Sequence, residues 1–535
     1  MKRILLIVAV FAALSGSAAC AADIYTEPYL LTLSPSDTMN VLWLTGENAS
    51  EAFVEFGEAE NMGGKVNAVE HEIKGLRRSV SLEGYDNVPE NNPALPVFQQ
   101  IGEIKGLKPG TKYFYRVTTK IGEKVITGNQ YFFKTAPLAD SGKTFNFVLI
   151  SDLQQRPQVL ETVKIAGQQD ADFILYAGDF QNTIWKTGEW FPVENCFIAP
   201  EEKGKEWFTV MQQAEDNTRL LQYMPIFPVP GNHEADDQRI WSKEMATDKT
   251  KKTMSIYLQL FRPMYPEQEA QLDGKHWYSA DYGDMHIIGL SLFRSYPGDG
   301  YEAPGWVPFD SVAPDSPQVK WLENDLSSKN SKYTWVVQHW HMLNRGAEVW
   351  IPMSEPLIDP EKPERAVYPY GDNCWNVLRP LYEGYGVNAV NFGHSHVYER
   401  YLINGVNYIE AATLGNNYRG ANDPLHFSGI APVFEQNDFR SCFVVTVTPD
   451  QMLGRAIAAS EEGSYKKGDV FDSFIIANLK GTEPDKDCKD EIKAWLEEYG
   501  CNTGVHILAA FALVGILFRR SISNSKIMNF FLSII

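Results

Sequence analysis

The chain has 535 residues and a formal net charge of −20, and 44% of its residues are hydrophobic. This length exceeds that of one ordinary domain, so we expect about three domains or segments. The acidic balance argues against a nucleic-acid duplex as a partner, because such a partner needs a basic face. It does not exclude a phosphate-bearing ligand, because metal ions in a site can outweigh the charge of the whole chain.

Residues 1–21 have the features of a secretory signal peptide. Lys2 and Arg3 precede an apolar core, and a stretch of small residues follows it. We therefore predict an exported protein of the periplasm, the cell surface or the extracellular space, associated with a bacterial envelope. Cleavage after Ala21 fits the small residues, and cleavage just before Cys20, which would make a lipoprotein, is the alternative.

Residues 24–137 are predicted to form an all-β domain. Short runs of β-branched and aromatic residues alternate there with turn residues, which is typical of strands. The stretch GLKPGTKYFYRV at 106–117 matches the tyrosine corner of an immunoglobulin-like sandwich, in which the hydroxyl of Tyr113 would bond to the backbone. We therefore predict an immunoglobulin-like β-sandwich, and a linker over residues 135–144 that leads into the next domain.

Residues 145–480 are predicted to form an α/β domain, because strand-like and helix-like segments alternate. Residues 206–223 have an amphipathic, helix-like pattern, and Ser316 followed by Pro317 predicts the start of another helix. The strand-like runs are FNFVLIS (145–151), DFILYAG (172–178), IFPVPG (226–231), MHIIGLS (285–291), YTWVVQ (333–338) and GVNAVNFG (386–393). Strands after residue 430 are predicted to complete a sheet of this domain.

Residues 481–499 are predicted to be a charged spacer, and residues 500–520 a C-terminal sorting or anchor segment. An apolar run over 505–518, short for a bilayer span, is followed by Arg519 and Arg520. The order of Cys/Gly motif, apolar run and basic pair resembles bacterial C-terminal sorting signals, so we expect membrane or envelope anchoring through this end. A docked helix is the alternative.

Polar residues follow five of the predicted strands. They are Asp152, Asp179, Asn232 with His233, His339, and His394 with His396. Sites in open α/β sheets form outside the carboxyl ends of strands, so these loops can meet at one edge. Two cations about 3.5–4 Å apart clamp a phosphate and generate a hydroxide at neutral pH, and Asp179 is the candidate bridging carboxylate. The donor types suit two ions of iron, zinc or manganese.

These motifs, in this order, resemble those of the calcineurin-like metallophosphoesterases and, more narrowly, the purple acid phosphatases. GNHE at 231–234 resembles their middle motif, and GHSHVYER at 393–400 their last one. Residues 24–137 resemble their fibronectin-type N-terminal domain, and GDVFDSFII at 468–476 their closing strand. The resemblance implies an N-terminal immunoglobulin/fibronectin-like sandwich and a C-terminal α/β metallophosphoesterase β-sandwich flanked by helices.

Carried over to this chain, the resemblance implies two metal sites that share one carboxylate. The first would take Asp179, Asn232, His339 and His394, and the second Asp152, Asp179, His396 and one further ligand. His233, with Asn232, would face the substrate phosphate as a transition-state stabiliser or proton donor.

The further ligand departs from the family pattern. Relatives place a His where this chain has Gln154, or a Tyr where it has Asn182. Gln154 would bind through its amide oxygen, and Asn182 or water are the alternatives. His341 lies two residues after His339, on the same face of a strand-like segment, and is a candidate general acid.

We therefore expect an exported dinuclear phosphoesterase that hydrolyses a small phosphorylated substrate, in the first place a phosphomonoester, by attack of a metal-bound hydroxide, as acid phosphatases do. A phosphodiesterase or nucleotide hydrolase is the alternative within this class of enzyme. A non-catalytic binding protein of the envelope surface, on a metallophosphatase scaffold, is the alternative outside it, and the unusual residues at positions 154 and 182 keep it open.

Overall fold

The computed structural model describes residues 24–76, 96–154, 159–182, 190, 206–212, 218–234, 254–266, 275–292, 294–295, 307–308, 310, 312, 314–340, 374–394, 396–411, 432–436, 440–461 and 465–479. The predicted signal peptide, spacer and C-terminal anchor segment lie outside these ranges, as does His341. Within these ranges, no helix is both long enough and apolar enough to cross a membrane.

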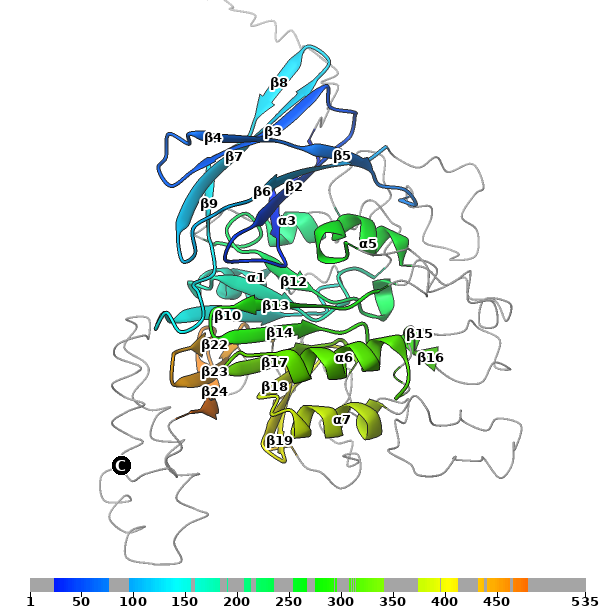
Figure 1. Ribbon diagram of the computed structural model, residues 1–535, viewed down its shortest axis with the longest axis vertical. Helices are drawn as coiled ribbons and strands as arrows, with labels where there is room; N and C mark the ends of the chain where they lie inside the picture. The colour runs from blue at the N-terminus through cyan, green and yellow to red at the C-terminus, as the bar shows by residue number, and fades with distance from the viewer. Residues whose placement is uncertain are drawn as a thin grey trace, which may run out of the picture.

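The N-terminal domain is a sandwich of two antiparallel sheets, seen at the top of Figure 1. The first sheet has the order β1 (Tyr29–Leu31), β2 (Met39–Thr45), β6 (Phe98–Ile104) and β5 (Val69–Glu72). The second has the order β4 (Gly64–Asn67), β3 (Glu51–Gly57), β7 (Lys112–Ile121) and β8 (Lys124–Thr127), with β9 (Tyr131–Lys134) also paired to β7. The predicted tyrosine corner is present, because the backbone N–H of Lys108 donates to the hydroxyl of Tyr113 at 2.9 Å.

The C-terminal domain is a second sandwich, made of two larger mixed sheets. One sheet has the order β12 (Ile226–Pro228), β11 (Phe173–Tyr176), β10 (Phe145–Ile150), β22 (Ser441–Val447), β23 (Gln451–Ala458) and β24 (Val470–Asn478). The other has the order β13 (Tyr278–Tyr282), β14 (Met285–Gly289), β17 (Tyr333–Val337), β18 (Ala389–Phe392), β20 (Val406–Ala411), β19 (Tyr398–Ile403) and β21 (Phe434–Gln436). A separate two-stranded ladder joins β15 (Arg294–Ser295) and β16 (Val307–Pro308). The predicted fold class is therefore confirmed. Of the strands after residue 430, β22, β23 and β24 complete the sheet of β10 through the pairing of β22 with β10, and β21 pairs with β19 in the other sheet.

Short helices accompany the two sheets. They are α1 (Val159–Gly167), α3 (Trp207–Met211), α5 (Ser255–Leu260), α6 (Pro317–Ser328) and α7 (Cys374–Gly384), with 3-10 turns at Asn232–Glu234 and Arg262–Met264. The hydroxyl of Ser316 accepts the N–H of Val319 and so caps α6, as the Ser-Pro pair predicts. The helix predicted over 206–223 is too long, because α3 ends at Met211 and residues 221–223 form a turn. The N–H of Arg219 bonds there to the carbonyl of Gly167, which ties this stretch to the end of α1 instead.

The two sandwiches are joined by a shared hydrophobic core and not by a linker alone. Side chains of β1 and β2, such as Tyr29 and Leu44, belong to the same buried cluster as Phe208 of α3 and Phe261 after α5. The hydroxyl of Tyr29 donates to the carbonyl of Leu260 at 2.8 Å. Figure 1 shows α3 and α5 between the upper sandwich and the central sheets. The N-terminal domain is thus packed onto the helices that lie beside the larger domain.

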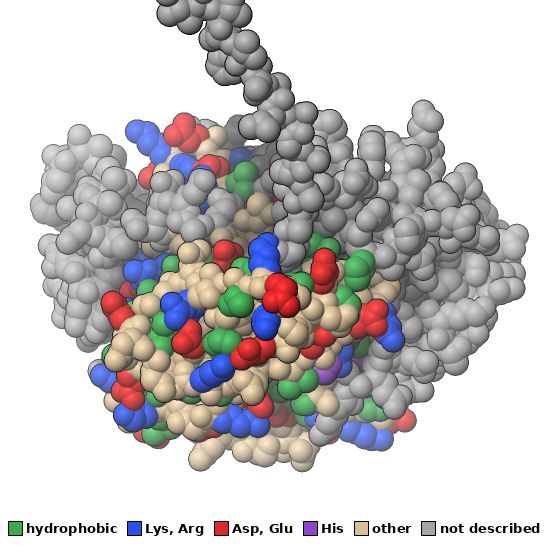
Figure 2. Space-filling view, turned by 90° about the horizontal axis from the view of Figure 1, so that it is seen from above, with side chains coloured by type: hydrophobic (Ala, Val, Ile, Leu, Met, Phe, Trp, Pro, Cys, Tyr) green, Lys and Arg blue, Asp and Glu red, His purple; other side chains and the backbone are tan. Residues whose placement is uncertain are grey.

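The surface of the described residues mixes charges of both signs. Figure 2 shows acidic and basic side chains interspersed over one face of the molecule. Several of these charges form exposed ion pairs within the N-terminal sandwich, such as Lys105 with Glu103 and Lys108 with Glu58. Such pairs contribute little to stability, so the fold depends on its cores.

Parallel strands bring the predicted site residues to one edge. Strands β10, β11 and β12 are parallel in one sheet, and β14, β17, β18 and β20 are parallel in the other. The carboxyl ends of β10, β11, β12, β17 and β18 lead directly into the loops that carry the predicted ligands. The topology therefore gathers donors from both sheets, as expected for a site at the carboxyl ends of strands.

Candidate metal centre

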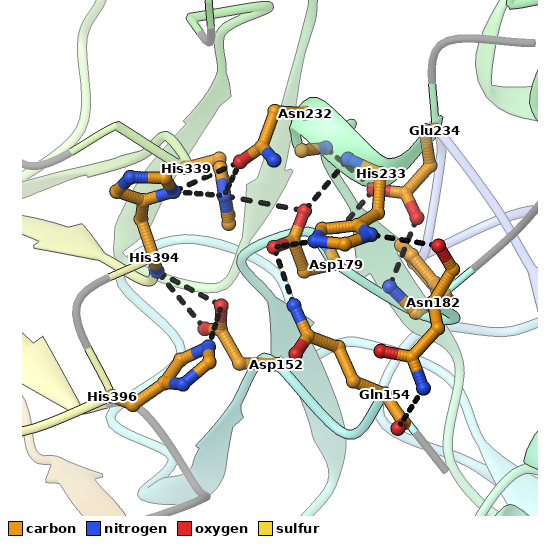
Figure 3. A network of polar contacts seen from close by, with 12 residues as sticks. Asp152, Gln154, Asp179, Asn182, Asn232, His233, Glu234, His339, His394 and His396 are labelled. Atoms are coloured by element: carbon orange, nitrogen blue, oxygen red, sulfur yellow. Dashed lines mark hydrogen bonds and ion pairs between the residues drawn. The ribbon is translucent and has the colours of Figure 1, made fainter. Parts of the chain in front are cut away.

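Seven of the predicted site residues converge where five strands end (Figure 3). Asp152 follows β10, Asp179 follows β11, Asn232 and His233 lie in the 3-10 turn after β12, His339 follows β17, and His394 and His396 follow β18. Asp152, Asp179 and His339 are fully buried or nearly so. The imidazoles and carboxylates point toward one another from separate loops, which is the arrangement a polynuclear cation site requires.

A first group of donors is formed by Asp179, His339 and His394, whose candidate ligand atoms all lie within 4.8 Å of one another. Asn232 completes it, because its Oδ1 lies 3.0 Å from Nε2 of His339 and 2.8 Å from Nδ1 of His394. Oδ1 of Asp179 lies 3.3 Å from Nε2 of His339. Two imidazole nitrogens, an amide oxygen and a carboxylate oxygen thus surround one point.

The hydrogen bond at Nδ1 of His339 determines whether Nε2, which faces the other donors, carries a proton or a lone pair. Its Nδ1 lies 2.7 Å from the carbonyl oxygen of Ala177, so Nδ1 carries the proton and donates it. In the neutral ring, Nε2 then presents a lone pair toward the oxygens of Asn232 and Asp179, which are acceptors as well. Electron pairs that face one another in a buried site repel unless a cation lies between them. The donor chemistry of this group therefore fits a metal ion.

A second group contains Asp152, Asp179 and His396, again with ligand atoms within 4.8 Å of one another. Nε2 of His396 lies 3.4 Å from Oδ1 of Asp152. Burial alone would raise the pKa of Asp152, but the hydrogen bond with His396 and the nearby His339 and His396 hold it below its ordinary value. Asp152 is therefore ready to act as an anionic donor. Asp179 belongs to both groups, which is the position expected of a bridging carboxylate.

Gln154 and Asn182 occupy different places relative to the second group. The side-chain amide of Gln154 lies 2.8 Å from Oδ2 of Asp179, so it reaches the candidate bridging carboxylate directly. A half-turn of that amide would present its oxygen at the same place. The side-chain amide of Asn182 instead donates to the backbone carbonyl of Gln154 at 2.7 Å. Of the two, Gln154 is the one directed at the donors (Figure 3).

His233 lies at the rim of the site, with its side chain 20% exposed. Its backbone N–H donates to Oδ1 of Asp179 at 3.0 Å, and its ring Nδ1 lies 2.9 Å from the carbonyl oxygen of Asn182. The ring is therefore held by Nδ1, and Nε2 faces Oδ2 of Asp179 at 3.7 Å. Nε2 is therefore the ring atom of His233 that can contact a ligand bound beside Asp179.

The backbone around the site is left-handed at five positions, a conformation that glycine adopts freely and other residues adopt less readily. Asp152, Gln154, Asp179, His394 and His396 have φ angles of 54°, 39°, 55°, 79° and 60°. Each such non-glycine residue costs on the order of 1–2 kcal/mol, so the side chains there serve some purpose that offsets the strain. Gly231 is required by close approach, because a Cβ at that position would overlap Oδ1 of Asp179.

Two residues of the site were not assigned from the sequence. Glu234 is fully buried and accepts backbone N–H groups of Gly231, Asp179 and Phe180. Burial and the neighbouring charge of Asp179 raise the pKa of Glu234 well above its ordinary value, although these three N–H groups lower it. Trp340 packs its indole against His394, with ring centroids 4.2 Å apart. The motif GNHE and the neighbour of His339 were visible in the sequence, but these contacts across loops were not.

Comparison with known families identifies two regions of the chain. The family described as Calcineurin-like phosphoesterase matches residues 145–398, and the N-terminal domain of purple acid phosphatases matches residues 27–135. The first match spans the loops from Asp152 to His396. The second spans the upper sandwich.

The chain is also similar to curated purple acid phosphatases. Purple acid phosphatase 1 of Ipomoea batatas is 26% identical over 56% of this chain and 50% of its own length. Purple acid phosphatase 21 of Arabidopsis thaliana is 23% identical over 70% of this chain and 67% of its own length. The chain thus spans about half of the first of these relatives and two thirds of the second.

A solved structure supports the fold. The purple acid phosphatase from yellow lupin seeds (Lupinus luteus) superimposes with a TM-score of 0.56 at 17% identity, over 84% of this chain and 73% of that one. The structure of PhoD gives a TM-score of 0.54 at 14% identity, over 88% of this chain and 97% of that one. At these identities the likeness shows a shared overall fold alone.

Proposed function

This chain belongs to the calcineurin-like metallophosphoesterases that carry the N-terminal domain of purple acid phosphatases, and we propose that it is an active, exported dinuclear phosphoesterase. The observation that carries the proposal is the position of Asp179 in both groups of converging donors. One carboxylate shared by two sets of imidazole and carboxylate ligands is what a two-metal hydrolytic site needs.

The proposed ligands divide between two ions of iron, zinc or manganese. Asp179, Asn232, His339 and His394 would hold one ion, and Asp152, Asp179, His396 and Gln154 the other. When bound, the ions would supply charge neutralisation for the phosphate and an activated water. The neutral amides of Asn232 and Gln154 keep further negative charge away from the place where a phosphate would enter.

His233 is the proposed contact to the substrate. Its ring is oriented by the carbonyl of Asn182, and its Nε2 points toward the space beside Asp179. From there, a protonated Nε2 can donate a hydrogen bond to a phosphate oxygen or give a proton to the leaving group. His341 is proposed as a general acid because it lies two residues after His339 in the sequence.

A small phosphomonoester is the proposed substrate class. Several relatives are named for phosphatase activity, among them the phosphoenolpyruvate phosphatase of Allium cepa, which is 24% identical over 58% of this chain. The proposed export, and an anchoring through the C-terminal segment, rest on the basic and apolar pattern of residues 1–21 and 500–520.

The first test is the metal content of the whole chain after supply of manganese, zinc and iron, together with hydrolysis of p-nitrophenyl phosphate and bis(p-nitrophenyl) phosphate. We expect two metals per chain and faster hydrolysis of the monoester. Asp179→Asn keeps the shape of the side chain and should abolish hydrolysis while circular dichroism shows an intact fold.

The alternative is a binding protein on the same scaffold, and one relative supports it. A protein of Arabidopsis thaliana that is 23% identical over 68% of this chain is named probable inactive purple acid phosphatase 24. One metal or none per chain, with no hydrolysis of either ester, would favour that alternative. Unchanged turnover in Asp179→Asn would refute the bridging role of this residue.

A further inference from the structure

Glu234 is a buried carboxylate beside the candidate metal centre that has no place among its proposed ligands. It ends the 3-10 turn that carries Asn232 and His233, and its carboxylate is directed at backbone N–H groups rather than at the imidazoles. A buried carboxylate is costly unless polar groups surround it. The groups that surround Glu234 indicate what it does.

Three backbone N–H groups from two loops donate to Glu234. Its Oε2 accepts the N–H of Gly231 at 2.6 Å and that of Asp179 at 2.8 Å, and its Oε1 accepts the N–H of Phe180 at 2.9 Å. Gly231 belongs to the loop after β12, whereas Asp179 and Phe180 belong to the loop after β11. One carboxylate therefore fastens the two loops to each other.

These bonds act where the backbone of the bridging candidate is strained. Asp179 has a φ of 55°, which an aspartate adopts only at a cost. Its N–H is fixed by Glu234, and one of its carboxylate oxygens is fixed by the N–H of His233. Asp179 lies so close to Gly231 that a side chain at position 231 would overlap it. The backbone and the carboxylate of Asp179 are thus both held by the loop that supplies Asn232.

The residue after Asp179 is anchored by packing as well as by Glu234. The ring of Phe180 stacks on Tyr176 with centroids 4.0 Å apart and packs on Phe261 at 4.9 Å. This aromatic cluster continues into the core shared with the N-terminal sandwich. Movement of the loop is therefore restricted on its far side, and Glu234 restricts it on the side of the donors.

We propose that Glu234 is a positioning residue that sets the spacing between Asp179 and Asn232, and thereby preorganises the site for metal before any metal binds. The proposal rests on the function proposed above, since it assumes that these two residues are ligands. Residues that orient metal ligands typically change metal affinity about 10–100-fold when substituted.

The test compares Glu234→Gln with the wild-type chain and with Asp284→Asn. The glutamine keeps the size of the side chain, but its amide nitrogen would face an N–H donor and only one acceptor oxygen remains. Asp284 is a matched control, since it is a buried carboxylate that accepts a backbone N–H, from Asp140, and it lies before β14 at the opposite end of the parallel strands.

The main readout is the metal dissociation constant of the folded protein, measured by chelator competition well below the melting temperature. We expect Glu234→Gln to bind metal about 10–100-fold more weakly and Asp284→Asn to bind it as the wild type does. Excess metal should restore part of the hydrolysis by Glu234→Gln but none of that by Asp179→Asn. A wild-type dissociation constant in folded Glu234→Gln would overturn the proposal, as would an equal weakening in Asp284→Asn.

A second measurement does not depend on the folding of the variant. In the metal-free wild-type chain, amide hydrogen exchange should show the peptides with Asp179, Phe180 and Gly231 to be protected, because their N–H groups are bonded to Glu234 without any metal. Fast exchange there would overturn the proposal. If the wild-type chain bound no metal and hydrolysed nothing while these amides were protected, the proposed function would fail and the loop-fastening role of Glu234 would stand.

Discussion

The indole of Trp340 lies against the imidazole of His394, with centroids 4.2 Å apart and ring planes inclined by 30°. Trp340 is itself buried in the core of the second sheet and comes from the loop after β17, whereas His394 follows β18. The packing therefore helps to fix the ring plane of a proposed metal ligand from the neighbouring strand.

This contact predicts different effects for two substitutions of Trp340. Trp340→Phe keeps an aromatic face against His394 and should retain metal affinity close to that of the wild type. Trp340→Leu removes the face, and we expect metal affinity to fall roughly 10-fold, the lower end for groups that orient a ligand. Chelator competition on both variants measures this, and equal affinities would show that the ring contact does not orient His394.

At Gln154, backbone strain and side-chain function can be separated. Its φ of 39° favours glycine, and its amide contacts Asp179. We expect Gln154→Gly and Gln154→Ala to lose metal from the second group equally, because both lack the amide. The glycine variant should be more stable than the alanine variant by about 1 kcal/mol, because it relieves the left-handed strain. Urea unfolding and metal analysis test this, and full metal content in both variants would exclude Gln154 as a ligand.

His286 should make stability depend on pH, away from the metal centre. Burial would lower its pKa, but hydrogen bonds and charges of Asp281 and Asp325 raise it to about 9. Since the unfolded value is about 6.5, the stabilisation is fully present below that pH and is lost as pH rises through about 9. A shift of this size corresponds to at most about 3 kcal/mol.

The check for His286 is a comparison of urea unfolding at pH 6 and pH 10 for the metal-free wild type and His286→Gln. The difference in unfolding free energy between the two proteins should be large at the lower pH and small at the higher one. A difference that stays constant across this range would mean that the charged form of His286 does not stabilise the fold.

A buried ion pair joins the strand after the last predicted ligand to the other sheet. Asp472 of β24 accepts from Arg400 at 2.9 and 3.2 Å and from the hydroxyl of Tyr398 at 2.8 Å. Asp472→Ala leaves the charge of Arg400 buried without its partner and should cost about 3–5 kcal/mol in unfolding free energy. Lys105→Ala, which breaks an exposed pair, should cost less than about 1 kcal/mol. Similar losses in both variants would contradict this reading of the pair.

The sequence predicted the fold well where a local pattern determines it. Apolar runs such as FNFVLIS became β10, and the Ser-Pro pair at 316 capped α6, because strand burial and helix capping depend on neighbouring residues. The amphipathic pattern at 206–223 predicted too long a helix, because a bond between Arg219 and Gly167, far apart in the chain, fixes that stretch.

In the candidate site, too, the sequence predicted what depends on local order and missed what depends on contacts between distant loops. The order of residues after the strands was enough to bring Asp152, Asp179 and His396 together, since parallel strands end at one edge. The sequence left Asn182 open as an alternative to Gln154, because only the course of their loops shows that the amide of Gln154 reaches Asp179 and that of Asn182 reaches a backbone carbonyl. Glu234 escaped notice because its partners are backbone groups, which carry no sequence signal.

The left-handed backbone at Asp152, Gln154, Asp179, His394 and His396 has a consequence for laboratory evolution of this chain. A library selected only for thermal resistance, with no demand for metal, should accumulate glycine or asparagine at these five positions before it improves the cores. A library selected for phosphate release should keep them unchanged. The two selections would therefore favour different residues at the same five positions. A comparison of the two selected libraries would identify the catalytic centre without reference to any relative.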